Sequence, residues 1–275
     1  ARVMSIRGIT SRNHSRTFFY PDMDQLNNPF LMQDMKKAVD RILTAITDKQ
    51  TILVFGDYDV DGTTSAAFLT LFFRSLDVDI HFYIPCRKKE GYGLSSQGID
   101  YAKYIGADIL ITCDCGITDF DKVADAQEKG LDVIVTDHHK PSKKLPDAYA
   151  VVNPNRLDCG YPFKGLCGAG VAFKLSLAIC EKGGYDPVKA WRHSDIVTLG
   201  IAADLVPMQD ENRAIVYKGI QQMGKKTNPG ITALIKTGGL LEKDITVGRL
   251  LFWITPKINA AGRLGNASRA VKLLI

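Results

Sequence analysis

Three aspartates, Asp57, Asp59 and Asp61, stand at alternate positions directly after an apolar, β-branched run at residues 51–55. The run predicts a buried strand, so the carboxylates are expected at its carboxyl end, where open α/β sheets place their ligands. Two unit charges ~4 Å apart repel by roughly 4 kcal/mol at an effective dielectric of ~20. Such carboxylates share a proton or bind a cation, and hard divalent cations prefer oxygen ligands. A solvated acidic turn or helix cap is the alternative.

Two further strands, predicted at residues 107–113 and 131–136, also run into ionisable side chains. The first is followed by Asp114 and the second by Asp137, His138 and His139. In a parallel sheet these strand ends meet at one edge. A mixture of carboxylate and imidazole favours Mn²⁺, Fe²⁺, Co²⁺ or Zn²⁺ over Mg²⁺, which prefers oxygen and water. A two-metal site that activates water and clamps a phosphoryl oxygen is the resulting hypothesis.

Later segments add further candidates for the same site. Gly168 and Gly170 begin a predicted helix, and backbone amides at a helix start can hold a phosphate; a close helix–sheet contact is the equal alternative. Asp204 is an acid in an apolar setting, where an acid is normally paired or metal-bound. No G-x-G-x-x-G follows the first strand, which argues against a dinucleotide oxidoreductase.

The elements that must position these residues alternate along the chain. Strands are predicted at 51–55, 78–84, 107–113, 131–136 and 148–152, with helices between them at 65–73, 95–105 and 118–129. This rhythm predicts an α/β fold with a parallel, doubly wound, five-stranded sheet flanked by helices. A helix at 32–46 should precede the sheet, started by Asp34 or the turn before it. Further helices are predicted at 168–180, 187–204, 211–223, 232–237, 247–253 and 266–275.

We expect three parts: residues 1–50 as a lead-in that packs on the core, 51–205 as the catalytic domain, and 206–275 as a basic helical connector. Residues 206–275 hold 11 Lys and Arg against 4 acids, although the whole chain has a net charge of only +5. This asymmetry suits a polyanionic partner, and solubility charge is the alternative. The first residue is Ala1 and the last predicted helix has no stop signal, so a fragment of a longer protein is expected.

The composition, with 45% apolar and 24% charged residues, is that of an ordinary soluble protein. The apolar runs are too short to span a membrane and no signal peptide is visible, so no membrane partner is expected. Six cysteines in a chain too large to need disulfides are expected to be reduced thiols in the cytosol.

Four ordered motifs resemble those of the DHH phosphoesterase superfamily: residues 57–62, 114–116, 137–139 and 203–207. Outside the site, the chain also resembles the RecJ family of single-strand-specific exonucleases, at residues 7–9, 84–87, 91–94, 152–155 and 256–263. The resemblance implies a two-metal phosphodiesterase that removes nucleotides from single-stranded DNA in the 5′→3′ direction, during DNA repair and recombination in the bacterial cytoplasm. It also implies Mn²⁺, with Mg²⁺ as the alternative, as one or two ions. A helicase and a single-strand-binding protein are candidate partners.

The resemblance assigns metal ligands residue by residue. Asp59 and Asp61 match the paired aspartates of the first motif, one for each metal. Asp114 matches the acid that bridges the two metals. His138 and Asp204 match the remaining ligands.

Other matches imply supporting roles and one departure. His139 is expected near the scissile phosphate, Asp137 is expected to orient a His through its ring N–H, and Arg263 is expected to grip a substrate phosphate. Many superfamily members have a His four residues before Asp59, where this chain has Phe55. Either Asp57 replaces that ligand or the first metal binds weakly. The smaller C-terminal domain of the family and the oligonucleotide-binding barrel of RecJ are not in the sequence.

Two alternatives have different functions. The first is a phosphodiesterase for short oligonucleotides or cyclic dinucleotides, or a pyrophosphatase; the segments around Arg7, Tyr92 and Arg263 argue against it. The second is a non-catalytic DNA-replication scaffold. Such proteins usually lose motif carboxylates or histidines, whereas this chain departs from the motifs only at Phe55.

Overall fold

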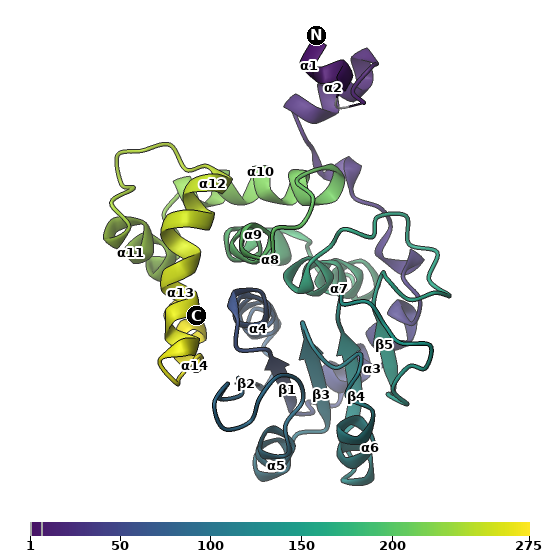
Figure 1. The fold of residues 1–275 in the computed structure, drawn as a ribbon. Coiled ribbons are helices and arrows are strands. Elements are labelled where there is room, and N and C mark those ends of the chain that lie inside the picture. The colour runs from purple at the N-terminus through teal and green to yellow at the C-terminus, as the bar shows by residue number, and fades with distance from the viewer. Residues whose placement is uncertain (1, 7) are drawn as a thin grey trace.

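A computed structural model describes residues 2–6 and 8–275 (Figure 1); Arg7, named above, lies outside the described residues. One parallel sheet has the strand order β2-β1-β3-β4-β5. Its strands are β1 (Ile52–Gly56), β2 (Ile80–Tyr83), β3 (Ile109–Cys113), β4 (Asp132–Thr136) and β5 (Ala150–Val152). The predicted fold class is confirmed. The three strands that run into ionisable residues, β1, β3 and β4, are neighbours in the sheet.

Helices cover both faces of the sheet (Figure 1). On one face lie α3 (Met35–Thr47), α4 (Val60–Arg74) and α7 (Gly168–Gly183). On the other lie α5 (Ser96–Tyr104) and α6 (Phe120–Glu128). Because successive side chains of a strand point to opposite faces, Val54 of β1 joins the first core and Phe55 joins the second.

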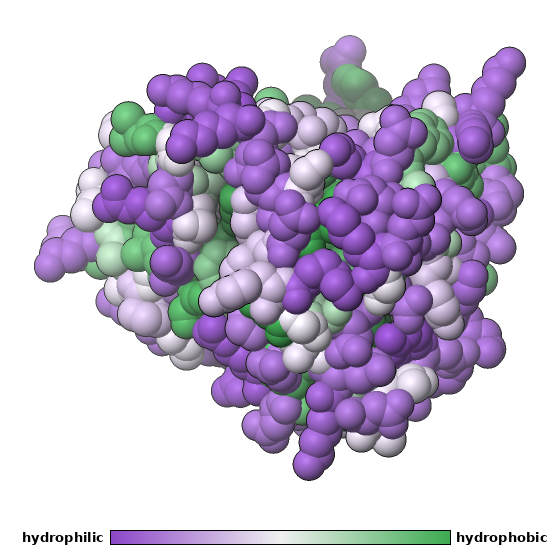
Figure 2. Space-filling view, turned by 90° about the horizontal axis from the view of Figure 1, so that it is seen from below, coloured by the Kyte–Doolittle hydropathy of each residue, from purple (hydrophilic) through white to green (hydrophobic). Residues whose placement is uncertain are grey.

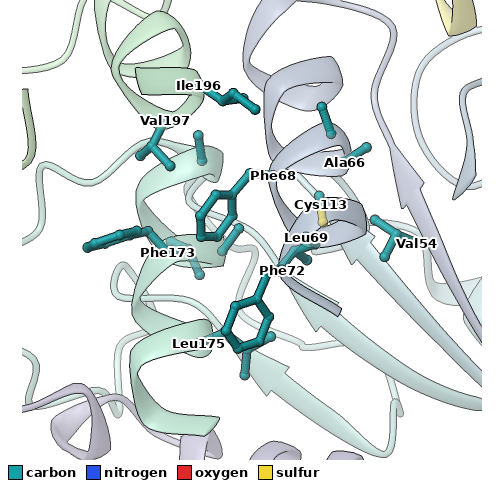
Figure 3. Close-up of a cluster of buried hydrophobic side chains, with 14 of the residues drawn as sticks. Val54, Ala66, Phe68, Leu69, Phe72, Cys113, Phe173, Leu175, Ile196 and Val197 are labelled. Atoms are coloured by element: carbon teal, nitrogen blue, oxygen red, sulfur yellow. The ribbon is translucent and has the colours of Figure 1, made fainter. Parts of the chain in front are cut away.

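A further helical layer covers α4 and α7 (Figure 1). It consists of α8 (Val188–Trp191), α9 (Ser194–Ala203) and α10 (Asp210–Gly224). Figure 3 shows Phe68 of α4 beside Phe173 of α7 and Val197 of α9, and Phe72 of α4 beside Leu175 of α7. The ring centroids of Phe68 and Phe173 are 5.7 Å apart. Because α4 is enclosed by the sheet and by α9, it is apolar around most of its circumference, as expected for a buried helix.

The remaining elements lie at the periphery. At the N-terminal end they are α1 (Arg2–Ile6), α2 (Arg12–Phe19), η1 (Met23–Gln25) and η2 (Pro29–Leu31). Beyond α10 they are α11 (Pro229–Thr237), α12 (Val247–Arg249), the π-helical η3 (Leu250–Ile254), α13 (Thr255–Arg263) and α14 (Ser268–Leu274). The latter group stands along one side of α4 and α9 (Figure 1). Within the described part of the chain, no helix combines the length and the apolarity needed to cross a membrane.

Three helix predictions were wrong in their bounds. The helix predicted to start at residue 65 begins at Val60, because Asp59 caps it by accepting the Gly62 N–H at 3.0 Å. The helix predicted at 187–204 is two helices, since α8 ends at Trp191 and α9 begins at Ser194. The segment predicted at 247–253 continues through η3 into α13, which tolerates a proline in its first turn.

A fully buried ion pair joins α7 to α10. Lys174 Nζ lies 2.7 Å from Glu211 Oε2, and both side chains are inaccessible to solvent. The Tyr161 hydroxyl donates to the same carboxylate at 2.7 Å, and Lys174 also donates to the Asn27 carbonyl. The pair and its hydrogen bonds therefore fix α10 and the segment before α3 to α7.

We predict that Lys174→Met lowers the free energy of unfolding by about 3–5 kcal/mol, because it leaves the Glu211 charge buried and unpaired. The double variant Lys174→Met/Glu211→Leu should recover most of that loss, since no charge then remains unpaired. Urea unfolding followed by circular dichroism measures both. A single variant as stable as the wild type would contradict this account of the pair.

Candidate metal centre

The first motif forms the turn between β1 and α4. Asp57 directly follows the strand, Asp59 is the N-cap of α4, and Asp61 lies in the first helical turn. The alternation of the three aspartates therefore does not continue the strand, because the last two belong to the helix. Asp57 and Asp61 are each only 2% exposed, which excludes the solvated acidic turn considered above.

The start of α7 holds the Asp61 carboxylate. Its Oδ2 accepts the Gly168 N–H at 2.5 Å and its Oδ1 accepts the Ala169 N–H at 2.9 Å. A Cβ added at Gly168 would lie 2.6 Å from Asp114 Cβ and 2.9 Å from Asp61 Oδ2. A Cβ added at Gly200 of α9 would lie 2.7 Å from Asp61 Oδ1. Both helices therefore need glycine to approach these carboxylates.

This geometry bears on the two alternatives for the start of α7. The Gly168 amide is occupied by Asp61, and Gly170 is buried beneath the Leu166 side chain. These contacts favour the close-contact alternative for Gly168, and phosphate binding by Gly168 and Gly170 stays a prediction. The N-terminus of α7 instead stabilises a protein carboxylate.

The turn after β3 presents Asp114. Its φ of 63° lies in the left-handed region, which Asp tolerates better than most residues. Gly116, with a φ of 107°, completes the turn, and a Cβ there would lie 2.7 Å from Thr112 Oγ1. Asp114 is 2% exposed, and the tight turn thus fixes its carboxylate at the edge of the sheet.

His138 lies between three of the carboxylates. Its Nε2 is 3.0 Å from Asp114 Oδ1, 3.8 Å from Asp61 Oδ2 and 3.7 Å from Asp204 Oδ2. Asp204 is the C-cap residue of α9. The candidate ligand atoms of Asp61, His138 and Asp204 all lie within 4.8 Å of one another. This separation is short enough for one ion to contact all three.

A second group of three carboxylates adjoins the first. The oxygens of Asp57, Asp59 and Asp114 also lie within 4.8 Å of one another. Phe55, at the position of the superfamily His, is fully buried on the far side of the sheet and stacks on Tyr83 at 5.6 Å. That position is filled by a core residue, and Asp57 offers an oxygen to the group in its place.

Asp137 is fully buried and positions both histidines. Its Oδ1 accepts the backbone N–H groups of His138 (2.7 Å) and His139 (3.0 Å) and lies 2.8 Å from His139 Nδ1. Burial opposes ionisation of Asp137, but the hydrogen bonds from His139 outweigh it and hold its pKa below the usual value. The same contact with Asp137 raises the pKa of His139, whereas burial lowers the pKa of His138.

Burial makes the remaining carboxylates difficult to ionise without a cation. Burial and the charge of Asp59 raise the pKa of Asp57 to about 7. Burial and the charges of Asp61 and Asp59 raise the pKa of Asp204 to about 7. Burial, together with neighbouring carboxylates, also raises the pKa of Asp61 and Asp114. The buried Oδ1 of Asp57 has no hydrogen-bond partner among the described residues. A divalent cation would offset this repulsion and supply the absent partner, so the residues present fit a metal site.

A cleft of about 270 Å³ opens beside the carboxylates. It is lined on one side by Asp59, Val60, Asp61, Ala203 and Asp204 and on the other by Leu251, Thr255, Pro256 and Asn259. Arg263 is exposed in the last turn of α13. Gly262, beside it, packs against the Tyr58 carbonyl, since an added Cβ would lie 2.7 Å from that oxygen. Arg263 therefore lies near the Asp57–Asp61 turn without joining the carboxylate cluster.

Tyr92 also contacts the site, where the residue pattern predicted no role for its side chain. The Tyr92 hydroxyl donates to the Asp114 carbonyl at 3.2 Å and lies 3.3 Å from His139 Nδ1. Its loop precedes α5, so the contact depends on the relative placement of β2, β3 and β4. Residue spacing gave no signal for it, although the segment 91–94 was noted for its resemblance.

Residues 51–201 match the family described as "DHH family, N-terminal domain". The chain belongs to the DHH family. "Single-stranded-DNA-specific exonuclease RecJ" of Bacillus subtilis is 40% identical over 278 residues, which cover 100% of this chain and 34% of the relative. RecJ of Escherichia coli is 38% identical over 255 residues, which cover 89% and 44%. This DHH-family chain thus spans less than half the length of these curated relatives.

Solved structures agree with this family assignment. A crystal structure of exonuclease RecJ bound to manganese has a TM-score of 0.81 and 34% identity, and the match covers 91% of this chain and 62% of that one. RecJ from Thermus thermophilus in complex with Mn²⁺ also has a TM-score of 0.81, with 30% identity, and the match covers 98% and 38%. These structural matches cover nearly the whole chain, and the α/β fold predicted from the sequence is confirmed.

We predict that Gly168→Ala lowers Mn²⁺ affinity at least about tenfold, since residues that support metal ligands typically contribute this much. The added methyl would displace Asp114 or Asp61. Gly170→Ala is the matched control, because its Cβ would meet only the Leu166 side chain, at 3.2 Å. Isothermal titration calorimetry on folded samples measures both variants, and equal affinities would refute the close-contact role of Gly168.

Proposed function

We propose that this chain carries the hydrolytic centre of a metal-dependent exonuclease that removes nucleotides from single-stranded DNA in the 5′→3′ direction. The convergence of three aspartates on His138 at one sheet edge, with Asp57 and Asp59 beside Asp114 in an adjoining group, supports this proposal. The similarity to RecJ exonucleases supports the choice of substrate. The activity would serve DNA repair and recombination in the bacterial cytoplasm, alongside a helicase and a single-strand-binding protein.

Mn²⁺ is the proposed cofactor, with Mg²⁺ as the alternative, because two similar structures are described with manganese and a third with Mg²⁺. The residues that would hold one or two ions are Asp57, Asp59, Asp61, Asp114, His138 and Asp204. When bound, such ions lower the pKa of water and stabilise charge on a phosphoryl oxygen. His138, with its lowered pKa, offers the neutral imidazole that a metal ligand requires.

The residues around the ligands would orient the substrate. His139 Nδ1 lies 2.8 Å from Asp137 Oδ1, and this contact raises the pKa of His139, so in the protonated ring the Nε2–H would donate a hydrogen bond to the scissile phosphate. Tyr92 limits rotation of the same ring from the other loop. Arg263, on α13, would bind a phosphate through two parallel N–H groups. In this scheme residues 51–205 are the catalytic domain, residues 1–50 pack on it, and residues 206–275 connect it to a substrate-binding domain.

We predict that Asp114→Ala in the full-length protein abolishes cleavage of single-stranded DNA, because its carboxylate belongs to two candidate groups of ligands, one with Asp57 and Asp59 and one with His138 and His139. The melting temperature should not fall, since the substitution also removes a buried, repelled charge. Asp121→Ala, in the exposed first turn of α6, is the control and should cleave normally. Release of nucleotides from a labelled strand measures the cleavage rate of the wild type and of both variants. Near-normal cleavage by Asp114→Ala would contradict the assignment of Asp114 to the hydrolytic centre.

The same assay separates the nuclease from its rivals within the family. A long single strand labelled at either end should be degraded from its 5′ end, whereas a dinucleotide, a cyclic dinucleotide and pyrophosphate should be poor substrates. A strong preference for any of the three small substrates would replace the proposed function with that activity. Specific DNA binding without hydrolysis of any substrate would favour the scaffold alternative.

A further inference from the structure

Two large aromatic side chains are exposed beside the carboxylate cleft. Phe252 is 74% exposed and Trp253 is 56% exposed, although both belong to a helical segment. Leu250 and Ile254, in the same segment, are fully buried. The segment is thus anchored to the core by its inner side, while its outer side presents the two rings.

The segment is η3, a π-helical stretch between α12 and α13. Single π-helical turns are uncommon in proteins and occur frequently at functional sites. Residues about four apart lie on the same side of a helix, so Phe252 adjoins Pro256 and Trp253 adjoins Lys257. Pro256 lines the cleft opposite Asp59 and Asp204. Phe252 therefore lies one helical turn from the lining of the cleft, and Trp253 follows it on the exposed side of the segment.

The segment of chain that carries the pair is basic. Residues 245–275 contain no acid and five bases, Arg249, Lys257, Arg263, Arg269 and Lys272. Figure 2 shows hydrophobic patches between hydrophilic side chains on the side of the molecule where α11 to α14 lie in Figure 1. Exposed rings next to cations are the combination with which proteins bind single strands, since the bases stack on the rings and the cations follow the phosphates.

We propose that Phe252 and Trp253 form a stacking platform for bases of the single strand whose end occupies the carboxylate cleft. This inference rests on the proposed function, because it takes single-stranded nucleic acid as the ligand. The platform would add affinity without reading sequence, since every base has a face that can stack. A protein partner fits less well, because five cations without an acid complement a phosphate backbone.

The test compares two strands in the full-length protein by fluorescence anisotropy. One is an oligothymidylate with phosphorothioate linkages, which slow cleavage. The other has the same length and the same phosphorothioate backbone, but abasic sites replace the thymidines, so it has no bases to stack. The wild type should bind the base-bearing strand more tightly. Phe252→Ala/Trp253→Ala should weaken binding of that strand at least about fivefold and leave binding of the abasic strand unchanged.

Two further variants make the result specific. Phe252→Tyr/Trp253→Phe keeps the aromatic faces and should retain the wild-type preference, which excludes a folding defect as the cause. Tyr104→Ala removes an exposed ring on α5, on the other face of the sheet, and should change neither affinity. An alanine variant that binds both strands as the wild type does, or loses affinity equally for both, would overturn the proposal. A lower melting temperature or a changed oligomeric state, with DNA affinity intact, would overturn it in favour of a protein contact.

The outcome is independent of the cleavage assay. A protein that stacks bases at η3 and does not hydrolyse the strand would retain this inference and lose the proposed function. A nuclease whose affinity is the same for the base-bearing and the abasic strand would retain the function and lose the platform.

Discussion

Repulsion between carboxylates buried at one edge of the sheet constrains the rest of the structure. Asp57, Asp61 and Asp114 are almost fully buried, and burial with mutual repulsion raises the pKa of each. A chain does not collect such groups without an offsetting interaction. Part of the offset is within the protein, where the start of α7 donates two amides to Asp61. A shared proton or a cation can supply the rest, and the candidate ligand atoms of Asp61, His138 and Asp204 lie close enough together for one ion to contact all three.

The layered fold follows from this constraint. The amides of α7 reach Asp61 because Gly168 permits a close approach, and Gly200 permits α9 to pack against the same carboxylate. The approach is held by the aromatic packing of Phe68 and Phe173 between α4 and α7. The additional layer of α8 to α10 therefore has a functional consequence, because α9 also carries Asp204 to the same cluster.

The sequence allowed the sheet and the convergence of the ligands to be predicted, since both depend on local periodicity and on the shared edge of parallel strand ends. It did not show that Asp61 belongs to a helix, because the capping bond of Asp59 is seen only once the helix is formed. The role of Gly168 was left open between two alternatives, since a 2.6 Å approach to Asp114 depends on contacts between distant segments. The π-helical turn at η3 and the Tyr92 contact left no periodic signal for the same reason.

Anomalous diffraction from a crystal soaked in Mn²⁺ would test the central claim most directly, because it locates the ion without relying on activity. We expect one or two manganese peaks, one among Asp61, His138 and Asp204, and the other, if present, among Asp57, Asp59 and Asp114. A soaked crystal with no peak at either position, or with manganese bound only elsewhere on the molecule, would contradict the claim that these buried carboxylates are arranged for a cation.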